Sequence, residues 1–285
     1  MGRLPNAIKG ASLTGLTPES SDSLIEPWPN IIIAAGRRSA PVARMIKRCC
    51  GAFLVQIMHP GNAGVDEIDL IVSPRHDRLA PAANIFEIIG AAHRVTPTRL
   101  ATDYKVWHSR FANLPRPFIA VIVGGSTRRR KFTEAMGTEL GLMCNAMANT
   151  SGGSLLVTTS RRTEKGPIEA LLKTLTVPRI IHTWDNKDEN PYFGYLAVAD
   201  ALVVTGDSVS MCSEACATKN PVYIFAPPML ITAKHARLHE ELYARGYARP
   251  LDGSHSAWKH PHLDQAADIA GEIHRRLAQS RVLPI

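Results

Sequence analysis

Three loops in the second half of the sequence combine glycines, hydroxyl side chains and arginines, which are the residue types that bind phosphate. They cover residues 124–128 (GGSTR), 159–163 (TSRRT) and 205–208 (TGDS). Glycine lets backbone N–H groups approach a phosphate closely, hydroxyls donate hydrogen bonds to it, and arginine neutralises its charge. The loops therefore predict one anion site. The predicted contact residues are Gly124, Gly125, Ser126, Arg128, Ser160, Arg161, Asp207, Ser208 and Ser210.

Each of these loops follows a short apolar run that is typical of a buried strand. The clearest example is the segment 201–225, which has the pattern of strand, turn, helix, turn and strand. Its helix is predicted to begin after Ser208, so that free N–H groups and the positive end of the helix dipole point beyond the strand ends. Glu214 lies within this helix. Its carboxylate suits the two hydroxyls of a ribose, and the alternative is an acid that stabilises the helix near its N-terminus.

A second group of polar residues follows the predicted strands of the first half of the sequence. Because the carboxyl ends of parallel strands meet at one edge of a sheet, these side chains are predicted to face one crevice. The candidates for substrate binding lie at the start of a predicted helix and are Arg37, Arg38 and Ser39. The candidates for a catalytic base are His59, His76, Asp77 and His93. The alternative for each of these loop residues is an ordinary exposed side chain.

Strand and helix patterns alternate along the whole chain, which indicates an α/β protein with parallel sheets. The 285 residues are 45% hydrophobic, which is enough to bury substantial cores. Pro115 and Pro117 interrupt the pattern before a fresh strand at 118–123. The sequence therefore predicts two Rossmann-like domains. The predicted divisions are residues 1–114, residues 115–262, and a C-terminal helix in residues 263–285 that packs back on the first domain.

Several classes of protein and site are disfavoured by the sequence. No window approaches eighteen apolar residues and no signal peptide is visible, so we expect a cytoplasmic protein. Five cysteines without CxxC spacing indicate free thiols rather than a zinc site. The chain has no GxxxxGK(S/T) motif and no GxGxxG motif after a strand, so neither a Walker loop nor an NAD site is supported. No metal site is predicted, because the acidic turn at 185–189 has the pattern of a solvated loop.

The net charge of +8 favours an anionic partner. Nucleic acid is one such partner, but residues 128–131 form the only strong basic cluster, and aromatic residues make up 6% of the chain. The sequence also lacks an aromatic RNA-binding motif or a zinc finger, so we expect no nucleic-acid binding. A compact anionic ligand such as a nucleotide fits the arginines at strand ends better. Peripheral contact with an anionic membrane, at its inner face, is the second expectation.

Seven motifs occur in a specific order within residues 28–250. They are AAGRRSAPVARMIKR, VQIMHPG, IDLIVSPRHD, NIFEIIGAAHRVTP, IAVIVGGSTRRRKFT, LLVTTSRRT and NPYFGYLAVADALVVTGDSVSMCSEACATKNPVYIF. This combination resembles the mitochondrial-fission "elongated mitochondria" family, whose bacterial members have no assigned function. The resemblance implies the GT-B fold of glycosyltransferases, in which two Rossmann-like domains face a cleft and the C-terminal domain binds a nucleotide-sugar.

The resemblance also implies roles for particular residues, by similarity to lipid-linked sugar transferases of cell-wall and lipid A synthesis. Gly125 and Ser126 match a loop that contacts the diphosphate. Residues 207–210 match a helix start that contacts phosphate, and Glu214 matches a glutamate that holds the ribose. No cofactor is implied, because the nucleotide-diphosphate sugar is the donor substrate. Family members usually begin with an extra strand before a segment like LPNAIKG at 4–10, so the N-terminal domain is expected to lack its first strand.

Two functions follow from this resemblance. The first is a metal-independent glycosyltransferase that moves a sugar to a lipid or envelope acceptor. In it, cationic groups and backbone N–H groups stabilise the departing nucleoside diphosphate, and a base from the first domain activates the acceptor hydroxyl. The alternative is a non-catalytic scaffold on the same fold that recruits a protein partner at a membrane surface. Plant members of the family recruit a dynamin-like protein in mitochondrial division.

Overall fold

The computed structural model describes residues 10–13 and 16–280, which form two compact units. Unit 1 contains the described residues up to Ile88 and those from Ala266 onwards, and unit 2 runs from Ile89 to Gln265. Each unit is built on one parallel sheet, which confirms the predicted α/β class. Of the segment 4–10 that was expected to follow a missing first strand, only Gly10 is among the described residues.

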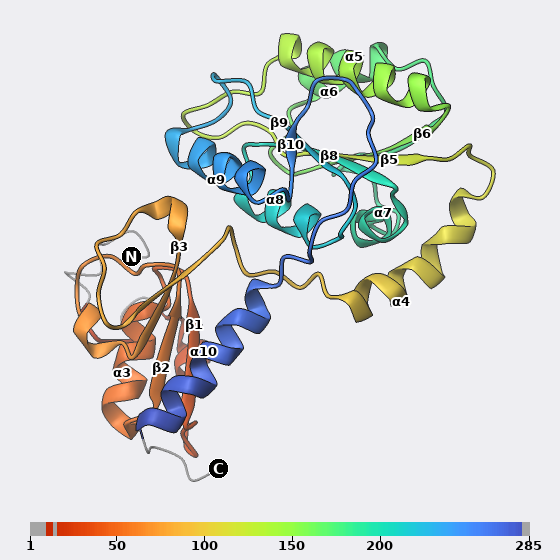
Figure 1. The fold of residues 1–285 in the computed structure, drawn as a ribbon. Coiled ribbons are helices and arrows are strands. Elements are labelled where there is room, and N and C mark those ends of the chain that lie inside the picture. The colour runs from red at the N-terminus through yellow and green to blue at the C-terminus, as the bar shows by residue number, and fades with distance from the viewer. Residues whose placement is uncertain (1–9, 14–15, 281–285) are drawn as a thin grey trace. The chain divides into compact units, whose positions relative to one another are not determined.

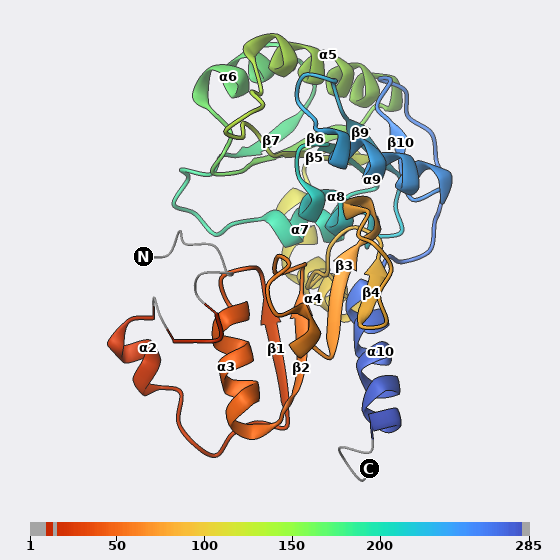
Figure 2. The same ribbon diagram turned by 90° about the vertical axis from the view of Figure 1, so that its left-hand side faces the viewer.

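The sheet of unit 1 has four strands in the order β1-β2-β3-β4, and all of its pairs are parallel (Figure 2). The strands are β1 (Ile31–Ala35), β2 (Phe53–Ile57), β3 (Leu70–Pro74) and β4 (Ile85–Ile88). The α-helices are α2 (Pro18–Asp22), α3 (Ala40–Cys50) and α10 (Gln265–Ser280). Two short 3-10 helices are η1 (Val65–Glu67) and η2 (Arg75–Asp77). Pro41 lies in the first turn of α3, where its missing N–H costs no helical hydrogen bond.

Two apolar clusters cover the two faces of this sheet. Along a strand, successive side chains point to opposite faces, so Leu54 packs in one cluster with Ala43 of α3. Its neighbour Val55 packs in the other cluster with Ile269 and Ile273 of α10. The C-terminal helix therefore covers one face of the sheet of unit 1, although it follows unit 2 in the chain.

An ion network joins α3 to η1. Glu67 accepts hydrogen bonds from Arg44, which is buried, and from Arg48, whose Nε and Nη2 lie 2.8 and 2.7 Å from its carboxylate oxygens. These hydrogen bonds lower the pKa of Glu67 from 4.5 to about 2, and the one from Arg48 has the largest effect.

We expect glutamine at position 67 to remove a pH-dependent part of the stability. The folded pKa is below the unfolded value, so the ionised carboxylate stabilises unit 1 above pH 4.5, and this contribution is lost as the pH falls towards 2. Urea titrations across that range should show the free energy of unfolding falling more steeply in the original protein than in Glu67→Gln. Equal slopes would contradict the expectation.

The sheet of unit 2 has six parallel strands in the order β10-β9-β8-β5-β6-β7. They are β5 (Phe118–Val123), β6 (Ser154–Thr159), β7 (Arg179–His182), β8 (Ala201–Thr205), β9 (Val222–Phe225) and β10 (Arg249–Pro250). The apolar runs before the three polar loops correspond to β5, β6 and β8, and the second predicted strand of the segment 201–225 corresponds to β9. Strand β10 is too short to show a periodic pattern. The strands β5, β6, β8 and β9 are almost wholly buried, as expected for parallel strands covered on both faces.

Helices cover both faces of this sheet (Figure 1). Val121 and Val123 of β5 pack in one cluster with α5 (Glu134–Ser151) and α6 (Lys165–Lys173). Ala120 and Ile122 pack in the other cluster, on the opposite face. The elements on that face are α4 (Pro97–Trp107), η3 (His108–Phe111), α7 (Tyr192–Val198), α8 (Val209–Cys216) and α9 (Ala233–Ala244).

The boundary between the units differs from the predicted division at 114/115. The chain passes from unit 1 to unit 2 after Ile88, because Val95, Trp107 and Phe111 are buried in the core of unit 2. The Phe111 and Tyr195 rings, for example, pack edge to face with centroids 5.7 Å apart. The proline-rich segment at 115–117 is therefore a loop within unit 2. Among the described residues, no helix is long and apolar enough to cross a membrane.

Candidate functional site

Asp207 joins the loops that follow β5, β6 and β8 at the carboxyl edge of the sheet in unit 2. Its side chain is fully buried. Oδ2 accepts a hydrogen bond from the Gly125 N–H (3.1 Å) and lies 2.8 Å from Nη2 of Arg162. Oδ1 accepts a hydrogen bond from the Thr205 hydroxyl (2.7 Å), whose oxygen in turn accepts one from the Gly124 N–H (2.7 Å). One buried carboxylate therefore fixes the geometry of three loops.

This network gives several predicted contact residues an internal role. The N–H groups of Gly124 and Gly125 donate to Thr205 and Asp207, so they do not point to an outside ligand. The Ser160 hydroxyl donates to the Gly124 carbonyl and accepts from the Arg162 N–H (3.1 Å). The carboxylate of Asp207 would repel a phosphate, and three donors already bind its oxygens. The hydrogen bonds of these residues hold the three loops together at this edge of the sheet.

Arg162 joins the Asp207 network, whereas the sequence pattern had pointed to its neighbour Arg161. Its guanidinium pairs with Asp207 and donates to the Gly125 carbonyl (3.4 Å). Its own carbonyl accepts from the Ser126 N–H (3.0 Å). Arg161 is exposed, and its guanidinium lies 5.4 Å from the centre of the Trp184 ring. Which of two adjacent arginines turns inward depends on the loop conformation, and the TSRRT pattern alone does not encode it.

The N-terminus of α8 adjoins this network. Ser208 is the N-cap, and its hydroxyl accepts from the Met211 N–H (3.4 Å). The N–H groups of Val209 and Ser210 precede that capped position, so they are placed to donate to an anion. Ser210 is exposed. The predicted start of the helix after Ser208 is confirmed.

Glu214 is half-buried, on α8 about one and a half turns from its start. Burial raises its pKa, opposed by a hydrogen bond from Tyr192 and by the charge of Arg94. Tyr192, on α7, donates its O–H to Oε2 of Glu214. Burial and the adjacent carboxylate raise the pKa of Tyr192 well above its usual value, so it remains a donor at neutral pH. The contact between Tyr192 and Glu214 cannot be recognised from sequence spacing, because the two residues lie on different helices.

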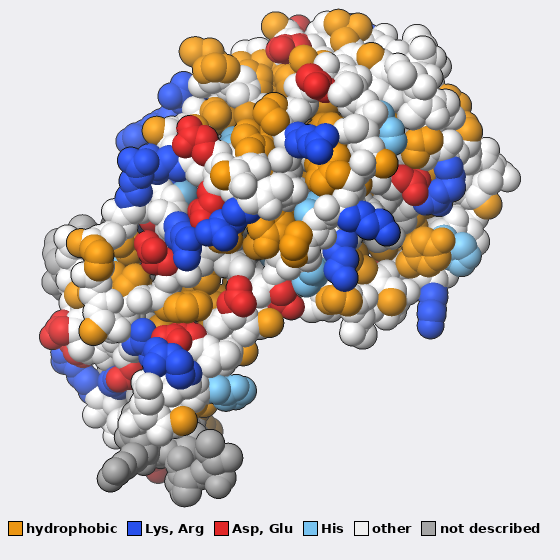
Figure 3. Space-filling model, in the orientation of Figure 1, with side chains coloured by type: hydrophobic (Ala, Val, Ile, Leu, Met, Phe, Trp, Pro, Cys, Tyr) orange, Lys and Arg blue, Asp and Glu red, His pale blue; other side chains and the backbone are white. Residues whose placement is uncertain are grey.

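Exposed cationic and aromatic side chains complete this edge of unit 2. Arg128 and Arg129 are exposed in the loop after β5. Trp184, in the loop after β7, is 54% exposed and borders a hollow of about 370 Å³ that is also lined by Thr159 and Thr183. On the face of the molecule shown in Figure 3, Lys and Arg side chains lie among Asp and Glu rather than in one continuous basic surface.

Three of the four base candidates lie in the loops after β2 and β3 of unit 1. His59 is half-buried, and its Nδ1 accepts from the Gly61 N–H (3.3 Å). His76 is buried, and its Nε2 lies 3.9 Å from Oδ1 of Asp77. Both loops follow the carboxyl ends of adjacent parallel strands.

The fourth base candidate, His93, lies in unit 2 rather than with the other three. It is half-buried next to the backbone of Leu263, and burial lowers its pKa. The sequence grouped it with the first half because the predicted domain boundary was too late in the chain. His93 lies in the segment that follows β4.

The substrate-binding candidates lie in the loop after β1. Arg37 and Arg38 are exposed. The Ser39 hydroxyl donates to the carbonyls of Ala35 and Gly36 (both 2.9 Å), so it braces the loop instead of capping the N–H groups of α3. Within the described residues, no group of three His, Cys, Asp or Glu side chains could hold a metal ion.

Comparison with known proteins gives one family and a fold. The model of the family described as "Mitochondrial fission ELM1" matches residues 5–277. The mitochondrial fission protein ELM1 of Arabidopsis thaliana is 29% identical over 300 residues, which cover 95% of this chain and 69% of that protein. The uncharacterized protein RP120 of Rickettsia prowazekii (strain Madrid E) is 28% identical, with 89% of this chain and 81% of that protein covered.

Among solved structures, the UDP-GlcNAc 2-epimerase of Neisseria meningitidis bound to UDP-GlcNAc has a TM-score of 0.50 to this chain. The sequences are 13% identical, and the match covers 83% of this chain and 68% of the epimerase chain. The likeness shows a GT-B-like fold. This chain spans between 60% and 68% of the length of the first solved structures that it matches.

Proposed function

This chain belongs to the Mitochondrial fission ELM1 family, and from that premise we propose that unit 2 binds a nucleoside diphosphate, as part of a nucleotide-sugar. The observation that carries the proposal is the joint placement of the α8 N-terminus and Glu214 beside the loops tied by Asp207. A helix N-terminus receives a phosphate, and a carboxylate further along the same helix receives hydroxyl groups of a sugar. The epimerase with the similar fold is bound to UDP-GlcNAc.

In this proposal each group has one task. The N–H groups of Val209 and Ser210, with the exposed guanidinium of Arg128, stabilise the charge of the diphosphate. Glu214, oriented by Tyr192, accepts hydrogen bonds from the ribose. Trp184 offers an aromatic face on which a nucleobase can stack. Asp207 and Arg162 hold the loops in place without touching the ligand.

The reaction we propose is transfer of the sugar to an acceptor hydroxyl, on a lipid or another envelope component. The leaving diphosphate is stabilised by preorganised donors, which is the largest contribution in reactions of this type. His59, His76 and Asp77 of unit 1 are the candidates for the base that removes the proton of the acceptor. Arg37 and Arg38 are the candidates that bind an anionic group of the acceptor.

Calorimetric titration with UDP and UDP-GlcNAc tests the proposal. We expect Glu214→Ala to weaken binding by about tenfold or more, because it removes charged hydrogen-bond acceptors, each worth roughly 1.5–3 kcal/mol. Ser210→Ala should weaken binding less, since the backbone N–H remains. Glu19→Ala, an exposed acid in the first turn of α2 in unit 1, is the matched control and should leave affinity unchanged.

Other nucleoside diphosphates should be titrated in parallel, because in this proposal the hollow beside Trp184 selects the nucleobase. If no nucleotide binds, the proposal fails. If nucleotides bind but no acceptor is glycosylated, the non-catalytic scaffold becomes the better description. In that case the same Glu214→Ala variant should still recruit its protein partner to membranes.

A further inference from the structure

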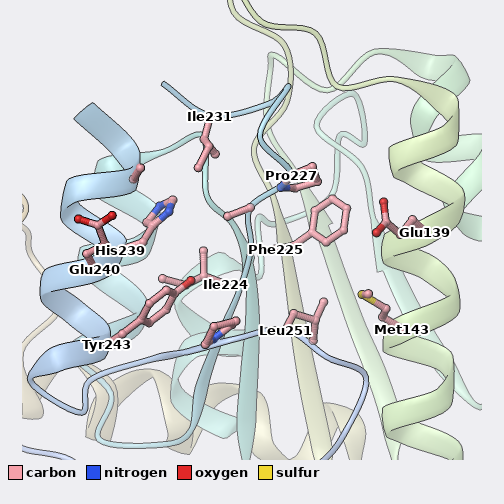
Figure 4. Close-up of a pocket in the computed structure, with 13 residues that line it drawn as sticks. Glu139, Met143, Ile224, Phe225, Pro227, Ile231, His239, Glu240, Tyr243 and Leu251 are labelled. Atoms are coloured by element: carbon pink, nitrogen blue, oxygen red, sulfur yellow. The ribbon is translucent and has the colours of Figure 1, made fainter. Parts of the chain in front are cut away.

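A second hollow in unit 2 lies at the β9–β10 edge of the sheet, between α5 and α9 (Figure 4). Its volume is about 380 Å³, and none of the residues that we assign to nucleotide binding lines it. We propose that this groove binds an organic ammonium, that is, a cation carried on an apolar body. The proposal is independent of the nucleotide site.

The floor of the groove is apolar. Ile224 and Phe225, at the end of β9, and Leu251, just after β10, are each at most 8% exposed. Met143 of α5 and Ile231 of the loop after β9 add apolar walls (Figure 4). Strand β10 has two residues, so it leaves the end of β9 covered by side chains rather than by another strand. Such a floor favours the apolar body of a small ligand.

Two exposed glutamates line the groove, together with the imidazole of His239. Glu139 projects from α5 towards the Phe225 ring, and Glu240 lies on α9, on the other side (Figure 4). No Lys or Arg is among the residues that line the groove. The groove is thus locally negative in a chain whose net charge is +8. A cation gains from this field, whereas an anion is repelled.

Two aromatic rings add to the selectivity for a cation. Phe225 in the floor and Tyr243 on the α9 side both border the groove (Figure 4). Burial raises the pKa of Tyr243, so its ring stays neutral at ordinary pH. The face of an aromatic ring attracts an ammonium group, and a carboxylate next to it strengthens the attraction. A carboxylate, two rings and an apolar floor are together the chemistry of an ammonium site.

Methyl NMR of the full chain tests this proposal directly. The probes are phenethylammonium, the neutral 2-phenylethanol and the anionic 3-phenylpropionate, which share one apolar body. We expect saturable shifts of the Ile224, Ile231 and Leu251 methyl signals, with the ammonium binding about fivefold more tightly than the alcohol, and the anion weakest. In Glu139→Gln, the ammonium and the alcohol should bind within about twofold of each other.

Two further variants separate this site from general effects. Glu19→Gln removes the same charge in unit 1 and should keep the preference for the ammonium. Ala236→Leu, on the α9 wall, should fill the groove and weaken all three probes while helix α9 is retained. Equal affinity for ammonium and alcohol in the original protein, shifts confined to residues outside the groove, or no saturable binding would each overturn the proposal.

Discussion

Replacing Asp207 by alanine is expected to destabilise unit 2 by about 3 kcal/mol, the lower end of the cost of breaking a buried ion pair. The change leaves the Gly125 N–H and the Thr205 hydroxyl without their acceptor, and it removes the carboxylate that pairs with the Arg162 guanidinium. Gly125 and Thr205 are buried, so water cannot replace the hydrogen bonds that these two donors lose. The Arg162 side chain is 37% exposed and can regain water, which is why the larger values in that range are not expected.

Urea denaturation followed by tryptophan fluorescence measures this effect, because Trp107, Trp184 and Trp258 all lie in unit 2. Asp207→Asn keeps one acceptor oxygen and should cost less than the alanine variant. Asp188→Ala, in the exposed turn after β7, is the matched control and should stay within about 0.5 kcal/mol of the original protein. An Asp207→Ala variant as stable as that control would show that the network is not structural.

Replacing Gly125 by alanine is expected to reduce the free energy of unfolding by about 4 kcal/mol, because a backbone clash adds to an unfavourable backbone angle. Gly125 has φ +135°, and a Cβ atom there would lie 2.3 Å from the Arg162 carbonyl oxygen and 2.5 Å from its carbon. Neither atom belongs to a flexible side chain, so the loops after β5 and β6 must separate. Nucleotide binding should be lost together with stability.

The Gly152→Ala variant separates the effect of the backbone clash on stability from the effect of the backbone angle. Gly152 also has positive φ (+66°), as the C-cap of α5, but a Cβ atom there meets nothing within 4 Å. We therefore expect it to cost only about 1 kcal/mol, the backbone contribution alone. Thermal and urea unfolding of the two variants side by side make the comparison. Similar losses for both would mean that the close approach of the two loops is not tight in solution.

Local sequence patterns predicted the α/β type of each unit and the edge of each sheet where polar residues collect. Apolar runs and turn residues are local signals, so the strands before the three polar loops and the start of α8 after Ser208 followed from short stretches of chain. The parallel arrangement then followed from the alternation of strands and helices. Since parallel strands end at one edge, the loops after β5, β6 and β8 were correctly placed together.

The contacts of each polar residue at that edge depend on the folded structure. Asp207 and Arg162 pair across two loops, and Tyr192 meets Glu214 across two helices, so neither contact has a signature in sequence spacing. The observed boundary lies at 88/89 rather than at the predicted 114/115, because Trp107 and Phe111 are buried in unit 2. The apolar character of a side chain does not indicate which of two cores it packs into. Local sequence patterns predict helices and strands. Contacts between residues far apart in the chain depend on how those helices and strands pack, which only the folded structure specifies.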